Sequence, residues 1–392
     1  MNSSNATITR LAALTLLALV LTSCRPHDFP KYPPNYREYA YVTNGGSGTL
    51  PVIDVVNVRV DRELPVGLNP VAVAASPTSN EIYVVNSGAE GAQGSVSVIS
   101  AESNTIAATI PVRRQPVSID IDPSGERAYV ANSGSNTVSV IDLKARREIA
   151  VLGAGEVPVA IRISPDGKTL VVANRSGNSV SLIDPATGTL RAVFSGCPGA
   201  SDAVILPDSS KAFVACAAGH QVMAIALAGS KFNPDQPDRL EALLDVGRAP
   251  VQLALKPDGG EIFVSNSLSD SVSEVVTTTD DVGGAYMMGD GPVRGLVTSD
   301  NSLLYVANFN SQYVTIYAID EGKRIPVSQG GSIRVGDGPS ALAFSSSGLL
   351  LFVVDARTAD VAVVRTASRS LFTVIPTGRA PNAIAVKAFK LP

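Results

Sequence analysis

The chain has 392 residues, a formal net charge of −4, two histidines and no tryptophan. This mildly acidic balance argues against a protein that binds nucleic acid by neutralising phosphates along its whole surface, although it is compatible with a local basic patch. Two histidines also supply few ligands or bases, so that histidine-rich metal and catalytic sites are poorly supported.

The N-terminal segment 1–23 has the pattern of a secretory leader. One positive charge, Arg10, precedes an apolar run from Leu11 to Leu21. That run is shorter than the roughly 20 residues that span a bilayer, and it matches the core of a signal peptide. Leu-Thr-Ser-Cys then resembles the bacterial lipobox, which implies cleavage before Cys24 and lipidation of that cysteine. The alternative is an ordinary secretory signal with a chance cysteine.

Residues 24–39 are rich in proline and polar side chains, a composition typical of an extended linker. We therefore expect a tether between a lipid anchor on Cys24 and a folded part that begins at residue 40. Arg25, in place of aspartate, follows the cysteine, and by resemblance to proteobacterial sorting this favours the outer membrane. The predicted location is the bacterial cell envelope, facing the periplasm or the cell surface.

After the tether the chain repeats one pattern. In the unit that begins at Pro116, apolar Val117, Ile119 and Ile121 alternate with polar residues, which is typical of a strand with two different faces. The turn Asp-Pro-Ser-Gly-Glu leads into a second strand, and two further strands follow. Four antiparallel strands joined by tight turns are the pattern of one β-propeller blade.

The repeats predict how many blades there are and how the ring closes. The second strand ends in asparagine or a substitute, at spacings of 42 to 50 residues, which fits propeller blades: Asn44, Asn86, Asn132, Asn174, Cys216, Asn266, Asn308 and Asp355. The first unit lacks a first strand, and Ala380–Phe389 supplies one at the end of the chain. We predict an all-β fold over residues 40–392, a single propeller of eight four-stranded blades closed by the C-terminal strand. Seven blades are the alternative.

The repeats resemble the YVTN β-propeller repeat family, whose name is the tetrapeptide at Tyr41–Asn44. Other matching elements are Ser-Pro-Asp-Gly at Ser164–Gly167, Val-Ser-Val-Ile-Asp at Val138–Asp142 and Val-Gly-x-x-Pro at Val66–Pro70 and Val246–Pro250. The resemblance implies the fold and an envelope or surface protein. It implies no particular activity, because propellers host many unrelated functions.

Two cysteines remain besides Cys24. Cys197 precedes the first strand of the fifth unit, and Cys216 ends its second strand. Because these strands are antiparallel neighbours, we expect a disulfide in an oxidising compartment, contributing about 3 kcal/mol. The alternative, a metal or catalytic thiol with His220, has no Cys-x-x-Cys or histidine cluster to support it.

The loops that join one blade to the next are expected to surround the mouth of the central channel. Their arginines would suit carboxylate or phosphate ligands. The alternative is that arginine and aspartate of adjacent blades pair across the seams. The candidate residues are Arg113, Arg114, Glu156, Arg248, Asp290, Asp337 and Arg379.

Three insertions, 88–94, 229–240 and 321–331, break the period. The first is expected on the mouth face and the others on the opposite face, where they carry recognition or are tolerated length variation. The acidic stretch Thr277–Asp281 lacks the spaced oxygen ligands of a calcium loop. No cofactor, metal site or catalytic residue is predicted.

The sequence favours a non-enzymatic, lipid-anchored envelope protein that binds a protein, glycan or small molecule. A closed ring has no free sheet edge, so a monomer is expected. One alternative is a propeller enzyme such as a lactonase, which would need converging catalytic groups in the channel mouth. Another is binding of nucleic acid or an anionic polymer through Arg113, Arg114, Arg248 and Arg379, marked by a steep loss of binding with salt.

Overall fold

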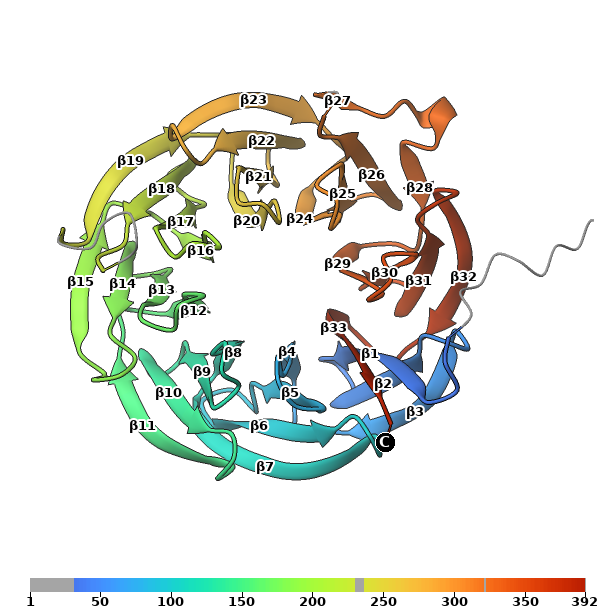
Figure 1. Ribbon diagram of the computed structural model, residues 1–392, viewed down its shortest axis with the longest axis horizontal. Coiled ribbons are helices and arrows are strands. Elements are labelled where there is room, and N and C mark those ends of the chain that lie inside the picture. The colour runs from blue at the N-terminus through green and yellow to red at the C-terminus, as the bar shows by residue number, and fades with distance from the viewer. Residues whose placement is uncertain (1–31, 230–235, 321, 392) are drawn as a thin grey trace, which may run out of the picture. The chain divides into compact units, whose positions relative to one another are not determined.

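The computed structural model describes residues 32–229, 236–320 and 322–391. Residues 37–389 form one compact unit, in which eight antiparallel sheets stand in a ring around a central opening (Figure 1). The predicted all-β propeller with eight blades is therefore confirmed, and the alternative of seven is wrong. The predicted leader, Cys24 and most of the tether lie outside the described residues. No helix among the described residues is long and apolar enough to cross a membrane.

The innermost and second strands form two layers around the opening (Figure 1). The innermost strands, in ring order, are β33 (Pro381–Lys390), β4 (Pro70–Ala75), β8 (Pro116–Ile121), β12 (Pro158–Ile163), β16 (Ala200–Ile205), β20 (Pro250–Leu255), β24 (Pro292–Val297) and β29 (Pro339–Phe344). They define blades 1 to 8. The second strands are β1 (Tyr36–Asn44), β5 (Glu81–Asn86), β9 (Arg127–Asn132), β13 (Leu170–Asn174), β17 (Lys211–Cys216), β21 (Glu261–Asn266), β25 (Leu303–Asn308) and β30 (Leu350–Asp355).

The third and outermost strands complete each blade. The third strands are β2 (Thr49–Asp54), β6 (Gln93–Ser100), β10 (Thr137–Asp142), β14 (Ser179–Ile183), β18 (Gln221–Ala226), β22 (Ser271–Val276), β26 (Tyr313–Ala318) and β31 (Asp360–Arg365). The outermost are β3 (Arg59–Pro65), β7 (Thr105–Arg114), β11 (Arg147–Gly153), β15 (Leu190–Ser195), β19 (Arg239–Asp245), β23 (Asp281–Met287) and β32 (Ser370–Pro376). In blade 7 the outermost strand is broken into β27 (Lys323–Arg324) and β28 (Ser332–Arg334), with the short helix η1 (Val327–Gln329) between them.

Ring closure follows the predicted route. The C-terminal strand β33 pairs with β1, and together with β2 and β3 it completes blade 1. Strand β1 begins at Tyr36, inside the range predicted as tether. Because β33 covers the edge of β1, that edge is not left free to template another chain.

The apolar core lies between blades. All residues of β13 and β14 are buried, because the second and third strands face neighbouring blades on both sides. Val171 of blade 4 and Val214 of blade 5 belong to one buried cluster. Each buried side chain of this kind contributes roughly 1.5–3 kcal/mol, so that the ring is stabilised by blade-to-blade packing.

The asparagines that end the second strands join neighbouring blades. In blade 2, the amide nitrogen of Asn86 donates to the Ser97 hydroxyl at 2.9 Å, and its oxygen accepts the Gly67 N–H at 3.0 Å. Blade 4 repeats this with Asn174, which donates to a serine at 2.9 Å and accepts a glycine N–H at 3.1 Å. A Cβ on Gly67 would lie 2.6 Å from Asn86. The glycine of each Val-Gly-x-x-Pro loop is therefore required by this close approach.

Blade 5 replaces this hydrogen bond with a covalent one. Cys197 stands at the position of Gly67 and Cys216 at that of Asn86, and the two form a disulfide with an S–S distance of 2.03 Å. Met223 occupies the position of the serine acceptor. This is the pairing expected from the sequence, and it tethers the incoming loop to the second strand.

Blade 8 has a carboxyl group where most blades have the amide. Asp355 is fully buried and accepts the Gly336 N–H at 2.9 Å. Burial raises the pKa of Asp355 to about 8, and the charge of neighbouring Asp360 adds to the rise. Among the described residues, one oxygen of each carboxyl group has no hydrogen-bond partner. Ala362 replaces the serine found at its position in blades 2 to 4.

Candidate functional site in the central channel

The opening at the centre of the ring contains a cavity of about 460 Å³, lined by the innermost strands of all eight blades. The third residue of every innermost strand lines it, and most of these residues are small, which keeps the channel open. They are Ala72, Ser118, Ala160, Asp202, Gln252, Arg294, Ala341 and Ala383.

Apolar residues line the channel in most blades, whereas its charged side chains come from one side. We call Arg162, Asp202, Gln252 and Arg294, from blades 4 to 7, the polar arc. Strands β29, β33 and β4 of blades 8, 1 and 2 lie on the other side of the opening (Figure 1). Their contribution, which we call the apolar wall, consists of Val71, Ala72, Val73, Ala341, Leu342, Ala383 and Ile384. Asn382, which also lines the cavity, donates its amide to the Pro70 carbonyl at 3.0 Å.

One ion pair occupies the centre of the polar arc. Arg162 donates to Asp202 at 2.9 Å across the seam between blades 4 and 5, and also to its neighbouring Ile161 carbonyl at 2.8 Å. The second Asp202 oxygen accepts the Leu253 N–H of blade 6 at 3.1 Å. Both oxygens of Asp202 are therefore bonded, and its charge is neutralised by Arg162.

Asp120 of blade 3 lies next to this pair. Its two oxygens accept the Ile163 N–H at 2.9 Å and its neighbouring Ile121 N–H at 3.0 Å. Burial raises the pKa of Asp120, while the Arg162 charge and the two N–H donors oppose the rise. Asp120 therefore ties blade 3 to blade 4 and is already occupied with backbone donors.

Arg294 differs from the other members of the polar arc. Gln252, at the equivalent position of blade 6, accepts the Gly295 N–H of blade 7 at 2.7 Å. A guanidinium group has no acceptor, so Arg294 cannot form this link to blade 8. Among the hydrogen bonds and ion pairs of the described residues, none involves the Arg294 side chain. Burial lowers the pKa of Arg294, Asp202 opposes this effect and Arg162 adds to it.

The residues predicted to form a binding ring at the mouth do not line the cavity. Arg113 pairs with Glu148 of the next blade's outermost strand at 2.8 Å, and Arg357 approaches Asp337 at 3.4 Å. The Arg248 side chain donates to the Leu268 carbonyl at 2.8 Å, and Asp290 accepts the Asn310 amide at 3.3 Å. Hence only Arg113 joins two blades by an ion pair, and it does so at the rim.

The remaining three candidates, Arg114, Glu156 and Arg379, are exposed, and no side-chain bond of theirs occurs among the described residues. None of the seven candidates lines the cavity, and whether they bind a ligand at the mouth stays a prediction. Arg113 and Arg114 end the outermost strand β7, and the other five candidates lie in loops that precede an innermost strand, whereas side chains within the innermost strands reach the channel. Arginine–aspartate pairing between adjacent blades, the alternative explanation, is not found within this set in the described structure.

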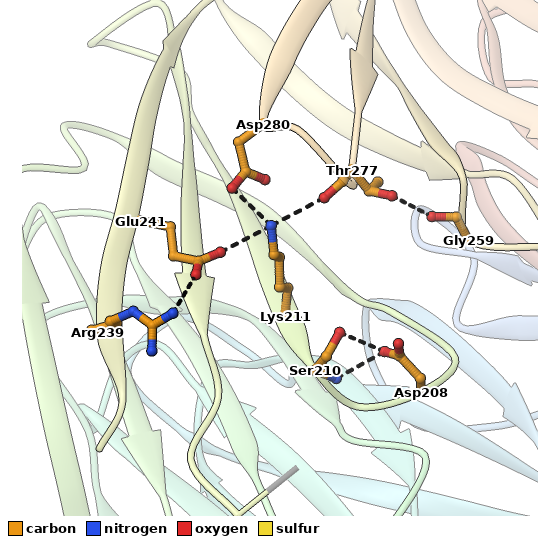
Figure 2. Close-up of polar contacts among 8 residues, drawn as sticks. All are labelled: Asp208, Ser210, Lys211, Arg239, Glu241, Gly259, Thr277 and Asp280. Atoms are coloured by element: carbon orange, nitrogen blue, oxygen red, sulfur yellow. Dashed lines mark hydrogen bonds and ion pairs between the residues drawn. The ribbon is translucent and has the colours of Figure 1, made fainter. Parts of the chain in front are cut away.

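The acidic stretch Thr277–Asp281 is part of a seam between blades 5 and 6, which Figure 2 shows. The Lys211 ammonium contacts Asp280 at 2.8 Å, Glu241 at 2.9 Å and the Thr277 carbonyl at 3.1 Å. Arg239 pairs with the other oxygen of Glu241 at 2.9 Å. Burial alone would lower the pKa of Lys211, but its bonds to the two carboxylates raise it. The cation held here is the lysine itself.

No described residue of the three insertions lines the cavity. Segment 88–94 forms a loop that continues into β6, and segment 321–331 contains β27 and η1. Residues 230–235 of the second insertion lie outside the described structure. Whether these segments carry recognition stays a prediction.

Sequence reasoning missed the polar arc, although a signal was available. When the eight innermost strands are aligned, their third position is alanine in four blades. In three consecutive blades, 5 to 7, it is Asp202, Gln252 and Arg294. Charged residues at a position that is otherwise small mark the side chains that face the channel.

No family model and no curated protein matches the chain. Solved structures with similar folds include dihydro-heme d1 dehydrogenase NirN in complex with DHE, with a TM-score of 0.72 and 14% identity over 92% of this chain and 77% of that one. Apo AztD from Citrobacter koseri has a TM-score of 0.69 and 14% identity, covering 90% and 98%. A candidate 6-phosphogluconolactonase from Bacteroides uniformis has a TM-score of 0.63 and 16% identity, over 90% of this chain and 100% of that one. At these identities the likeness shows that the chain is a β-propeller protein and does not determine its activity.

Proposed function

We propose that this chain is a non-enzymatic binding protein of the bacterial envelope, a propeller of the YVTN-repeat type that holds a small molecule in its central channel. The observation that carries the proposal is Arg294, a partly buried guanidinium that lines the channel and has no bonded partner among the described residues. A partly desolvated charge without a partner is unfavourable, and a bound ligand of opposite charge offsets that cost. The cavity volume of about 460 Å³ lies in the range of small-molecule sites.

The arrangement supports binding more than catalysis. The other charged groups at the arc already have partners, because Arg162 pairs with Asp202 and Asp120 accepts two backbone N–H groups. A hydrolase such as a lactonase needs a base or nucleophile free to exchange protons. The polar arc instead presents one free donor group, which suits recognition.

Filling the channel tests the proposal. Ala72 and Ala383, from the adjacent blades 2 and 1, both line the channel at the apolar wall, and the double variant Ala72→Leu/Ala383→Leu should exclude the ligand by volume. We expect mass spectrometry of the denatured wild-type protein, purified from its own envelope, to reveal a bound small molecule. The channel variant should lose it at least about tenfold, which corresponds to 1.4 kcal/mol.

The matched control is Ala107→Leu on the exposed face of β7, which should retain the compound. Retention of the same compound by the channel variant would contradict the proposal, as would the lack of any bound compound in the wild type. Melting temperatures of both variants should stay near that of the wild type, which excludes loss through unfolding.

The envelope location rests on the Leu-Thr-Ser-Cys sequence that ends at Cys24. We expect the wild-type chain to sediment with membranes and Cys24→Ser to be recovered in the soluble fraction, because acyl chains contribute about 0.8 kcal/mol per buried methylene. If Cys24→Ser still sediments with membranes after a high-salt wash, the lipid anchor is not what holds the protein there.

A further inference from the structure

The lack of a partner for Arg294 follows from the ring order. Its counterparts Asp202 and Gln252 each reach the next blade and accept a backbone N–H there, at 3.1 and 2.7 Å. The next blade after Arg294 is blade 8, whose innermost strand presents Ala341 at the third position and Ala343 at the fifth. Neither alanine side chain has an acceptor to offer, and among the described residues no carbonyl accepts from Arg294, so the guanidinium stays available to a molecule in the channel.

The charge balance of the arc selects a single negative charge. Arg162 and Asp202 neutralise one another at 2.9 Å, and Asp120 beside them is bonded to two backbone N–H groups, so that within the polar arc Arg294 is the charged group without an ion-pair partner among the described residues. A monoanion matches that charge. A dianion would keep one uncompensated charge in an enclosed space that also contains the Asp202 carboxylate, and the proximity of Asp202 is evident from its effect on the pKa of Arg294.

The shape of the free group selects a planar acid. A guanidinium presents parallel N–H donors that match the two oxygens of a carboxylate, and such paired bonds are among the strongest in proteins. The Leu253 and Gly295 N–H groups are already bonded to Asp202 and Gln252, so Arg294 is the charged donor of the polar arc that remains for an acid.

The rest of the cavity selects an apolar body. The apolar wall contributes Val71, Val73, Leu342 and Ile384 among its alanines. A ligand that lies against it removes apolar surface from water, at about 25 cal/mol per Å². An acid without an apolar part would leave water against the apolar wall, where that water finds few hydrogen-bond partners.

We propose that the channel binds a small monocarboxylate, with its carboxylate on Arg294 and its apolar body against the apolar wall. This inference rests on the proposed function, because it names the ligand class of the same channel. It predicts that the channel distinguishes a charged ligand from an uncharged one and a monoanion from a dianion, because hydrogen bonds to charged groups are stronger than those between neutral groups.

The experiment uses three probes of similar size: trans-cinnamate, its uncharged amide trans-cinnamamide, and phenyl phosphate, which is a dianion at pH 8. Dissociation constants are measured by ligand-observed NMR with the mature full-length chain. The wild type should bind cinnamate at least about tenfold more tightly than either of the others. Arg294→Met keeps the length of the side chain without its charge and should remove this preference. Arg175→Met, on an exposed turn, should not.

The possible results separate the inference from the proposed function. Equal binding of cinnamate and cinnamamide would overturn the role of the carboxylate while leaving a channel that binds small molecules. Tighter binding of phenyl phosphate would overturn the choice of a monoanion. A cinnamate preference that survives in Arg294→Met would place the carboxylate elsewhere and overturn the inference. No binding of any probe by the wild type would overturn the inference, whereas the proposed function is decided separately by the compound that mass spectrometry finds in the wild type. Unchanged melting temperatures show that each variant is folded.

Discussion

Replacing Cys197 and Cys216 together with alanine should lower the free energy of unfolding by about 3 kcal/mol. The two residues are 19 positions apart and both are fully buried. The disulfide therefore restricts the unfolded chain, and its loss also removes the link between the blade 5 loop and β17. Denaturant unfolding of the wild type and the double variant measures the difference. An unchanged midpoint would contradict a stabilising role.

The other blades provide a matched control for this disulfide. The variant Cys197→Gly/Cys216→Asn introduces the glycine–asparagine pair of blade 2. The amide of the new asparagine would still lack a hydroxyl acceptor, because Met223 stands where blade 2 has a serine. Met223→Ser supplies that acceptor and loses buried apolar contacts. Its cost should be smaller in the glycine–asparagine background than in the double-alanine background, by about 1 kcal/mol. Equal costs would show that the hydrogen-bonded link does not form in blade 5.

Asp355→Asn should stabilise the protein at pH 9 by roughly 1–3 kcal/mol, the cost of a buried unsatisfied polar group, and have a much smaller effect at pH 5. The folded-state pKa of Asp355 is raised to about 8 by burial and by Asp360, against an ordinary value near 4. Between these values the folded chain holds a proton that the unfolded chain releases. The wild type should therefore lose stability as the pH rises from about 4 to about 8.

The asparagine variant should show a flatter dependence, since its amide is neutral and donates to the Asp360 carboxylate. Unfolding free energies at several pH values between 5 and 9 measure this, with the exposed Asp281→Asn as control. If Asp355→Asn stabilises equally at pH 5 and pH 9, the proton on Asp355 is not what links stability to pH.

The repeat unit was sufficient to predict the architecture. Strand alternation, turn residues and the regular position of Asn44 to Asp355 determine the blades, because each of these signals is local. Ring closure followed from Ala380–Phe389, a first strand without a second. The disulfide could be expected because antiparallel neighbours bring Cys197 beside Cys216.

The site was harder to predict because it depends on what each blade presents to the next. Residues of the predicted mouth ring, such as Arg114 and Arg379, precede an innermost strand, and the path of the loop leaves them exposed. Arg294 could have been found by aligning the repeats. That it lacks a partner depends on Ala341 and Ala343 of the following blade, and this requires knowing how far each side chain reaches across a seam.

The most direct test of the channel site is a crystal of the protein soaked with 4-bromocinnamate and measured at the bromine absorption edge. The account predicts an anomalous bromine peak inside the channel, against the apolar wall of β29, β33 and β4, with the carboxylate within hydrogen-bond distance of Arg294. Bromine peaks confined to the mouth loops or the outer rim, with none inside the channel, would contradict it.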